Sequence, residues 1–159
     1  MSIGGGSVLM ARISTTSSDA DFAIEIVSAG VGRVTVGAFT ETFSMDLTFW
    51  DAKRYEESWA RALRRVEETD MNTSCLVTFI TDPKAGNFVR CWPLYRIHGE
   101  IFVQNSLIIF GDLDHSFDPE NPWHSVEPRE VVDEDGSNIS EWHVDVGAVQ
   151  RFRTVSGWA

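Results

Sequence analysis

The chain has 159 residues, of which 43% are hydrophobic, including 10 Phe and 6 Trp. This is enough apolar material for the core of one ordinary domain, so the composition excludes a largely disordered chain. The 24 acidic side chains outnumber the 13 basic ones and give a formal charge of −11, which disfavours sequence-independent binding to nucleic acid because phosphate backbones repel a negative surface.

The start of the chain predicts neither export nor membrane insertion. Residues 1–12 are glycine-rich and lack the basic region and apolar run of a secretory signal. No segment approaches the ~20 apolar residues of a membrane helix. We therefore expect a flexible leader at residues 1–12, with Met10 as an alternative start, a single domain at residues 13–159, and a cytoplasmic protein with no membrane partner. Cys75 and Cys91 are expected to stay unpaired, as thiols do in a reducing cytosol.

Strands are predicted in the first third of the chain. Residues 22–27, 31–36 and 40–47 are rich in β-branched and aromatic side chains, and glycines separate the first two from their neighbours. Residues 8–13 allow a further strand.

A helical period follows between Asp51 and Glu68. Apolar side chains recur there every three or four residues, with charged side chains between them, which predicts an amphipathic helix. The apolar positions are Ala52, Tyr55, Trp59, Ala62, Leu63 and Val66. Thr48 and Asp51 have the spacing of a capping box, although Asp51 is also suited to be the N-cap itself.

An antiparallel meander is predicted next. It consists of strands at residues 75–81, 88–97 and 100–110, with His98-Gly99 as a two-residue hairpin loop between the last two. A turn at residues 134–137 then leads into a strand at residues 139–144.

A closing helix is predicted after Asp145, which is a suitable N-cap. Its inward side chains are expected to be Val146, Val149, Phe152 and Val155, with Gly157 just past its end. The order of strands, helix, strands and helix predicts an α+β fold in which two helices cover antiparallel sheets.

The adjacent amides Gln104 and Asn105 are unusual inside a strand. Pro93 removes a backbone donor from the neighbouring strand. If Ile97 pairs with Glu100, Pro93 lies opposite Gln104. We therefore expect one of the two amides to be buried and to bond the backbone near Pro93, rather than to bind a ligand.

The patterns that would indicate metal binding or catalysis are incomplete. Asp112, Asp114 and Asp118 alternate as in a calcium loop, but Phe117 stands where the EF-hand needs glycine and Trp123 where it needs glutamate. The histidines have no zinc-site spacing, and the glycine motifs of hydrolases, NTPases and dinucleotide-binding proteins are missing, so no metal or cofactor is expected.

Two classes of protein remain open at this point. One is a small hydrolase that uses paired carboxylates such as Glu120 and Glu141, and the other is a generic binding or scaffold domain.

One set of residues resembles a known family. It comprises Trp50-Asp51, Tyr55, Ser58-Trp59, Leu63, Asp82-Pro83, Asn87-Phe88, Trp92, Leu94-Tyr95, Gln104-Asn105, Phe117-Asp118-Pro119-Glu120-Asn121, Arg129, Asp135-Gly136 and Ile139-Ser140-Glu141-Trp142-His143. In this order, over Leu47 to Phe152, it resembles the immunity proteins of bacterial contact-dependent growth inhibition systems.

The resemblance implies both a function and a fold. Such a protein binds and neutralises the C-terminal toxin domain of a cognate delivered effector, and the implied toxin is a nuclease. The implied fold is Whirly-like, with four strands, a helix, four strands and a helix. The residues expected to form the scaffold are Trp50, Tyr55, Trp59, Trp92, Tyr95, Gln104, Asn105 and Trp142.

The toxin-binding residues are expected outside this scaffold, in the acidic segments around residues 112–120 and 127–135, because loops vary without disturbing the core. The candidates are Asp112, Asp114, Glu130, Asp133 and Glu134. A nuclease must be basic to hold nucleic acid, so an acidic inhibitor gains faster encounter and charge complementarity. We therefore predict a binding protein that is not an enzyme.

Overall fold

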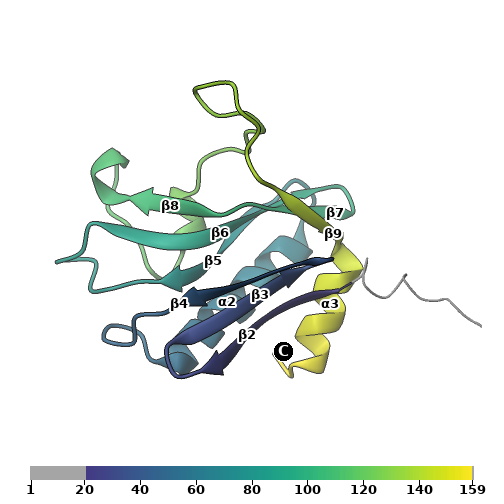
Figure 1. The fold of residues 1–159 in the computed structure, drawn as a ribbon, viewed down its shortest axis with the longest axis horizontal. Coiled ribbons are helices and arrows are strands. Elements are labelled where there is room, and N and C mark those ends of the chain that lie inside the picture. Colours follow the sequence, from purple (N-terminus) through teal and green to yellow (C-terminus); the bar gives the residue numbers. More distant parts are fainter. Residues whose placement is uncertain (1–20, 159) are drawn as a thin grey trace, which may run out of the picture.

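The computed structural model describes residues 21–158. Two antiparallel sheets and two α-helices make up this part of the chain (Figure 1). The α+β class predicted from the sequence is confirmed. The predicted leader at residues 1–12, the alternative start at Met10 and the strand allowed at residues 8–13 lie outside the described residues.

The first sheet contains β2 (Phe22–Ser28), β3 (Val31–Val36) and β4 (Phe39–Ser44), in that order. The three strands predicted here are confirmed, although β4 ends three residues earlier than expected. The alternating side chains of β2 and β3 place Ile24, Val34 and Val36 in the core. Within residues 21–158, three strands precede the first α-helix, whereas the resemblance implied four.

The second sheet is built around one long central strand. Its strands are β5 (Thr73–Phe79), β6 (Phe88–Ile97), β7 (Glu100–Val103), β8 (Ser106–Ile109) and β9 (Trp142–Asp145). β6 pairs with β5 on one side and with β7 and β8 in succession on the other, and β9 pairs with β7. The predicted meander is confirmed, but the strand expected at residues 100–110 is two strands, so this sheet has five strands rather than four.

The break between β7 and β8 lies opposite Pro93. Ile97 pairs with Glu100, as predicted, and the backbone N–H of Gln104 donates to the carbonyl of Pro93 at 3.1 Å. Pro93 has no N–H to return, so regular pairing stops at this point. The register of β6 is the same against β7 and β8, so no residue is inserted at the break.

Helix α2 (Ala52–Glu68) begins at Asp51, whose carboxylate accepts a hydrogen bond from the backbone N–H of Arg54 at 2.9 Å. Asp51 is thus the cap on its own, and the backbone N–H of Thr48 donates to Asp46 instead. The helix buries the predicted face from Tyr55 to Val66, but Ala52 is exposed because it precedes the point where α2 meets the sheets.

Two aromatic side chains of α2 also form polar contacts in the core. The indole N–H of Trp59 donates to the carbonyl of Val77 on β5 at 2.7 Å. The hydroxyl of Tyr55 donates to the carbonyl of Asp46 at 2.6 Å and accepts from the N–H of Ile80 at 3.1 Å. Burial raises the pKa of Tyr55 to about 12. These bonds fix the position of α2 along β5 more specifically than apolar contact alone.

Helix α3 (Val146–Val155) is capped by Asp145, which accepts from the N–H of Ala148 at 2.8 Å, as predicted. The prediction that Val155 points inward is wrong, because Val155 is 86% exposed. The chain turns after α3 at Gly157, which has a φ of 75°, and brings Trp158 back against Phe152 and Trp59. Trp158 thus contacts aromatic side chains of both α2 and α3.

Two further expectations concern the thiols and the membrane. Cys75 and Cys91 are free and buried in the second sheet, and burial raises the pKa of the Cys75 thiol well above its usual value. Neither α-helix found in residues 21–158 has the length and apolarity needed to span a bilayer.

Replacing Trp59 tests the anchoring role of α2. Trp59→Ala removes a fully buried ring and the bond to Val77, and we expect it to lower the unfolding free energy by about 3–5 kcal/mol. Trp59→Phe keeps most of the ring and should be less destabilising. Denaturant unfolding measures both, with Glu57→Ala on the exposed side as the control. Wild-type stability of Trp59→Ala would contradict this assignment.

Candidate functional site

The negative charge of the chain is concentrated in one segment. Residues 97–150 contain twelve Asp and Glu side chains but a single basic one, Arg129, while the rest of the sequence contains twelve of each sign. The whole excess of −11 therefore lies in the segment that carries β7, β8, β9 and the long connection between β8 and β9. This connection includes the loop that projects above the second sheet (Figure 1).

The structure places all five predicted toxin-binding residues in this connection, and all five are exposed. Asp112 ends the short helix η2 (Phe110–Asp112) directly after β8, and Asp114 follows it. Glu130, Asp133 and Glu134 lie between helix η3 (Pro122–Ser125) and β9.

Two adjoining hollows relate these residues to one another. Asp112, Asp114 and Glu127 line a hollow of about 230 Å³. Glu127 and Glu130 line a second hollow of about 200 Å³. Residues 125–128 contribute to both hollows, so the carboxylates of Asp112, Asp114, Glu127 and Glu130 share one side of the molecule. Glu127 was not among the five predicted candidates, although it begins the second of the two acidic segments identified in the sequence.

The acidic side chains of this surface differ in how they are engaged. Asp114 contacts the Nδ1 of His115 at 2.8 Å, and this hydrogen bond lowers the pKa of Asp114. Asp133 accepts from the backbone N–H groups of Asp135 and Ser137, each at 2.9 Å, and so shapes its own turn. In contrast, within residues 21–158 the carboxylates of four others have no hydrogen bond or ion pair. These are Asp112, Glu127, Glu130 and Glu134.

A partly buried ion pair closes the base of the projecting loop. Arg129 donates twice to Glu141, at 2.7 and 2.6 Å, and its guanidinium lies 4.2 Å from the ring centroid of Phe102. The amide nitrogen of Gln104 donates to Glu141 at 2.8 Å and to the carbonyl of Glu130 at 2.9 Å. The hydrogen bond from Arg129 holds the pKa of Glu141 below its usual value. The one basic side chain of the segment is therefore neutralised.

This arrangement corrects the prediction for Gln104 and Asn105. Gln104 is buried and Asn105 is exposed, in agreement with the expectation that one amide faces inward. The prediction that the buried side chain bonds the backbone near Pro93 is wrong, because the main chain of Gln104 makes that contact. Its side chain instead points to the loop, a long-range contact that local spacing does not encode.

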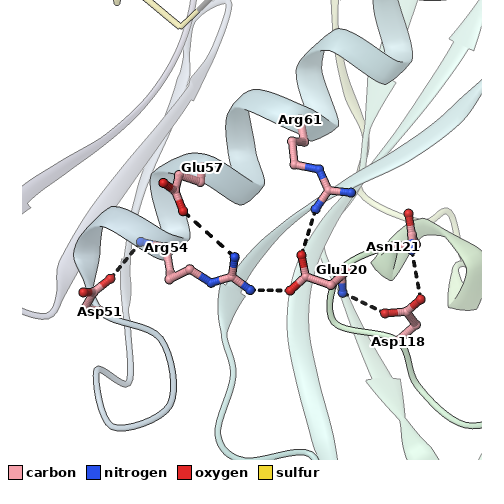
Figure 2. A network of polar contacts seen from close by, with 7 residues as sticks. All are labelled: Asp51, Arg54, Glu57, Arg61, Asp118, Glu120 and Asn121. Atoms are coloured by element: carbon pink, nitrogen blue, oxygen red, sulfur yellow. Dashed lines mark hydrogen bonds and ion pairs between the residues drawn. The ribbon is translucent and has the colours of Figure 1, made fainter.

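The other acidic loop is attached to α2 (Figure 2). Glu120 binds Arg61 at 3.2 Å and also contacts Arg54. Asp118 accepts from the backbone N–H of Glu120 and the side chain of Asn121, each at 2.9 Å, and these bonds lower its pKa. Because the arginines are partly exposed, each ion pair stabilises the fold only modestly, but together they define where this loop sits.

The remaining predicted scaffold residues lie in the core or against it. Trp50, Trp59 and Trp92 are buried, and Trp142 stacks on Phe39 with ring centroids 3.8 Å apart. Tyr95 is buried and donates its hydroxyl to the carbonyl of Glu127 at 2.8 Å. Tyr95 therefore also supports the second acidic segment.

The arrangement does not support the paired-carboxylate hydrolase. Glu120 and Glu141 bind different arginines, which lie on different parts of the chain. A general acid needs a raised pKa, whereas that of Glu141 is lowered. Over residues 21–158, no group of three or more His, Cys, Asp or Glu side chains is placed to hold a metal ion.

The fold and this surface define a small α+β protein with one strongly acidic side. Residues 45–152 match the model of the CdiI N-terminal domain, and the chain belongs to this family. It is 34% identical to Immunity protein CdiI of Enterobacter cloacae over 119 residues, which are 75% of this chain and 81% of that protein.

A solved structure gives the same relationship. A chain of the CdiA-CT/CdiI toxin and immunity complex from Enterobacter cloacae matches with a TM-score of 0.75 and 30% identity, over 87% of this chain and 99% of that chain. The resemblance to immunity proteins found in the sequence is thereby confirmed.

Replacing Gln104 tests the base of the loop. Gln104→Leu leaves Glu141 and the carbonyl of Glu130 without this donor, and we expect it to destabilise the fold by about 1–3 kcal/mol. Amide exchange should also become faster in residues 130–140. The exposed Asn105→Ala is the matched control and should change stability by less than about 0.5 kcal/mol. Unchanged exchange in Gln104→Leu would refute the role given to this side chain.

The ion pair of Glu141 also predicts a pH dependence. Because its pKa is lower in the folded state than the usual 4.5, its contribution to stability is present above that value and is lost as the pH falls through the folded-state pKa. The stability difference between wild type and Glu141→Gln should therefore shrink from about pH 6 to about pH 3. Denaturant unfolding at a series of pH values measures this, and a constant difference would contradict the prediction.

Proposed function

We propose that this protein is an immunity protein that binds and neutralises the C-terminal toxin domain of a cognate contact-dependent growth inhibition effector. It acts by forming a complex and not by catalysis. Family membership supports the role, as does the similarity to a chain of the CdiA-CT/CdiI toxin and immunity complex. The observation that carries the proposal is the placement of the whole excess charge of −11 in residues 97–150, largely on exposed loops.

The charge also indicates the chemistry of the partner. Unengaged carboxylates at Asp112, Glu127, Glu130 and Glu134 suit a basic surface, and a nuclease carries such a surface where it holds nucleic acid. The proposed partner is therefore a basic nuclease domain, and nucleic acid itself is not a partner. The complex forms in the cytoplasm, where the nuclease would act. Neutralising a lethal enzyme requires nanomolar or tighter binding, roughly −12 kcal/mol.

Binding and inhibition test the proposal directly. The purified chain should form a one-to-one complex with the toxin domain encoded beside it and should abolish the activity of that domain at equimolar concentration. Calorimetry and a toxin activity assay measure the two properties. A wild-type chain that neither binds nor inhibits this domain would overturn the proposed function.

A set of charge reversals tests the proposed surface. Asp112, Glu127, Glu130 and Glu134 are replaced together by Lys, while Asp114 and Asp133 are left unchanged because they bond within their loops. We expect association at low salt to slow by about ten-fold or more, because electrostatic steering is lost. The melting temperature should change little, since exposed charges contribute little to stability. Stopped-flow mixing with the toxin domain measures the rate.

The matched control changes the net charge by the same amount elsewhere. It replaces four acidic residues by Lys. These are Asp21, which precedes β2, Glu41 on β4, and Glu56 and Glu68 on α2. Association should slow much less in this control. Equal rates for the two variants would show that the acidic surface has no specific role in the encounter.

A further inference from the structure

Strand β8 has a free edge. It pairs with β6 on one side, whereas β7, on the same side of β6, is covered in turn by β9. Within residues 21–158, no strand continues the sheet beyond β8. The sheet therefore has a vacant strand position next to β8. β9 fills the corresponding position next to β7 (Figure 1).

The pairing pattern identifies the backbone groups on this edge. The N–H of Phe110 donates to the carbonyl of Asn87 at 2.9 Å, one position beyond the pair Phe88–Ile109. Hydrogen-bonded and non-bonded pairs alternate along an antiparallel ladder, so Ile109 and Leu107 form the non-bonded pairs. Their N–H groups point away from β6, and in the described part of the chain neither makes a hydrogen bond.

β8 is short, at four residues, but its sequence carries no chemical block of this edge. Sheet edges are usually blocked by lysine, proline or a bulge, and Ser106–Ile109 contains none of these. Leu107 and Ile109 are also 45% and 46% exposed. An exposed apolar edge with unpaired backbone groups is a template for pairing with another chain.

Acidic side chains flank the free edge at both ends. Asp112 follows the C-terminal end of β8 directly. Glu130 lines the same hollow as Ser106 and Leu107 at the N-terminal end. A strand lying along β8 would therefore meet apolar side chains and free backbone groups at its centre and carboxylates at either end.

We propose that the toxin domain adds a strand to the edge of β8. The strand carries Lys or Arg on either side of an apolar centre, and its backbone pairs with Leu107 and Ile109. Main-chain bonds supply affinity in this mode of recognition, while the flanking side chains supply specificity. This inference rests on the proposed function and assigns the docking geometry within it.

Amide exchange of the wild-type chain tests the proposal without a substitution. The N–H groups of Leu107 and Ile109 should exchange fast in the free protein and at least about ten-fold more slowly in the complex with the toxin domain, since hydrogen-bonded amides are protected. Ile108, which pairs with Val89, is the internal control and should be protected in both states. If the toxin domain binds but leaves Leu107 and Ile109 unprotected, strand addition is wrong while the proposed function stands. Protection of both amides in the free protein would also overturn it, because the edge would already be occupied.

A pair of variants at Leu107 separates main-chain pairing from side-chain contact. Leu107→Pro removes the outward N–H, and proline is tolerated where that group faces away from the sheet. Leu107→Thr keeps the N–H and strand propensity but shortens the apolar side chain. We expect Leu107→Pro to weaken toxin binding by at least about ten-fold and Leu107→Thr by less than about three-fold, with melting curves to verify folding. Equal losses in both variants would overturn main-chain pairing.

Discussion

The hydroxyl of Tyr55 is the contact on which the arrangement of the protein depends. It donates to the carbonyl of Asp46, just after the first sheet, and accepts from the N–H of Ile80, just after β5 in the second sheet. One buried side chain of α2 therefore holds the ends of both sheets. Trp59, one turn further along, adds the bond to Val77. Since a buried polar group without a partner is costly, these bonds leave α2 little freedom to slide or rotate between the sheets.

The outer side of α2 carries arginines that contact an acidic loop. Arg54 and Arg61 hold Glu120, and the rings of Trp50 and Trp123 lie beneath the two guanidinium groups. These two basic side chains of α2 are thus directed towards the protein itself. Core packing and surface charge are connected by this helix.

The sequence predicted the elements whose signals are local. The helical period after Asp51, the caps Asp51 and Asp145 and the hairpin at His98-Gly99 depend on neighbouring residues only, and the structure has all of them. The division of residues 100–110 into two strands, the bond from Gln104 to Glu141 and the return of Trp158 depend on residues far apart in the chain. Their spacing carries no information about these contacts. Likewise, the acidic loops were visible in the sequence, but the free edge of β8 depends on how distant strands pair.

The ion pair between Arg129 and Glu141 has a consequence for how such proteins diversify. It closes residues 130–140 at their base, and the bridge between Val132 and Asn138 narrows the loop again. The entropy lost on closing a loop grows only slowly with its length, by about 0.6 kcal/mol for each doubling. Insertions and deletions at the tip are therefore nearly neutral for the rest of the fold. A lineage can exchange the length and sequence of this loop while the strands below it stay the same.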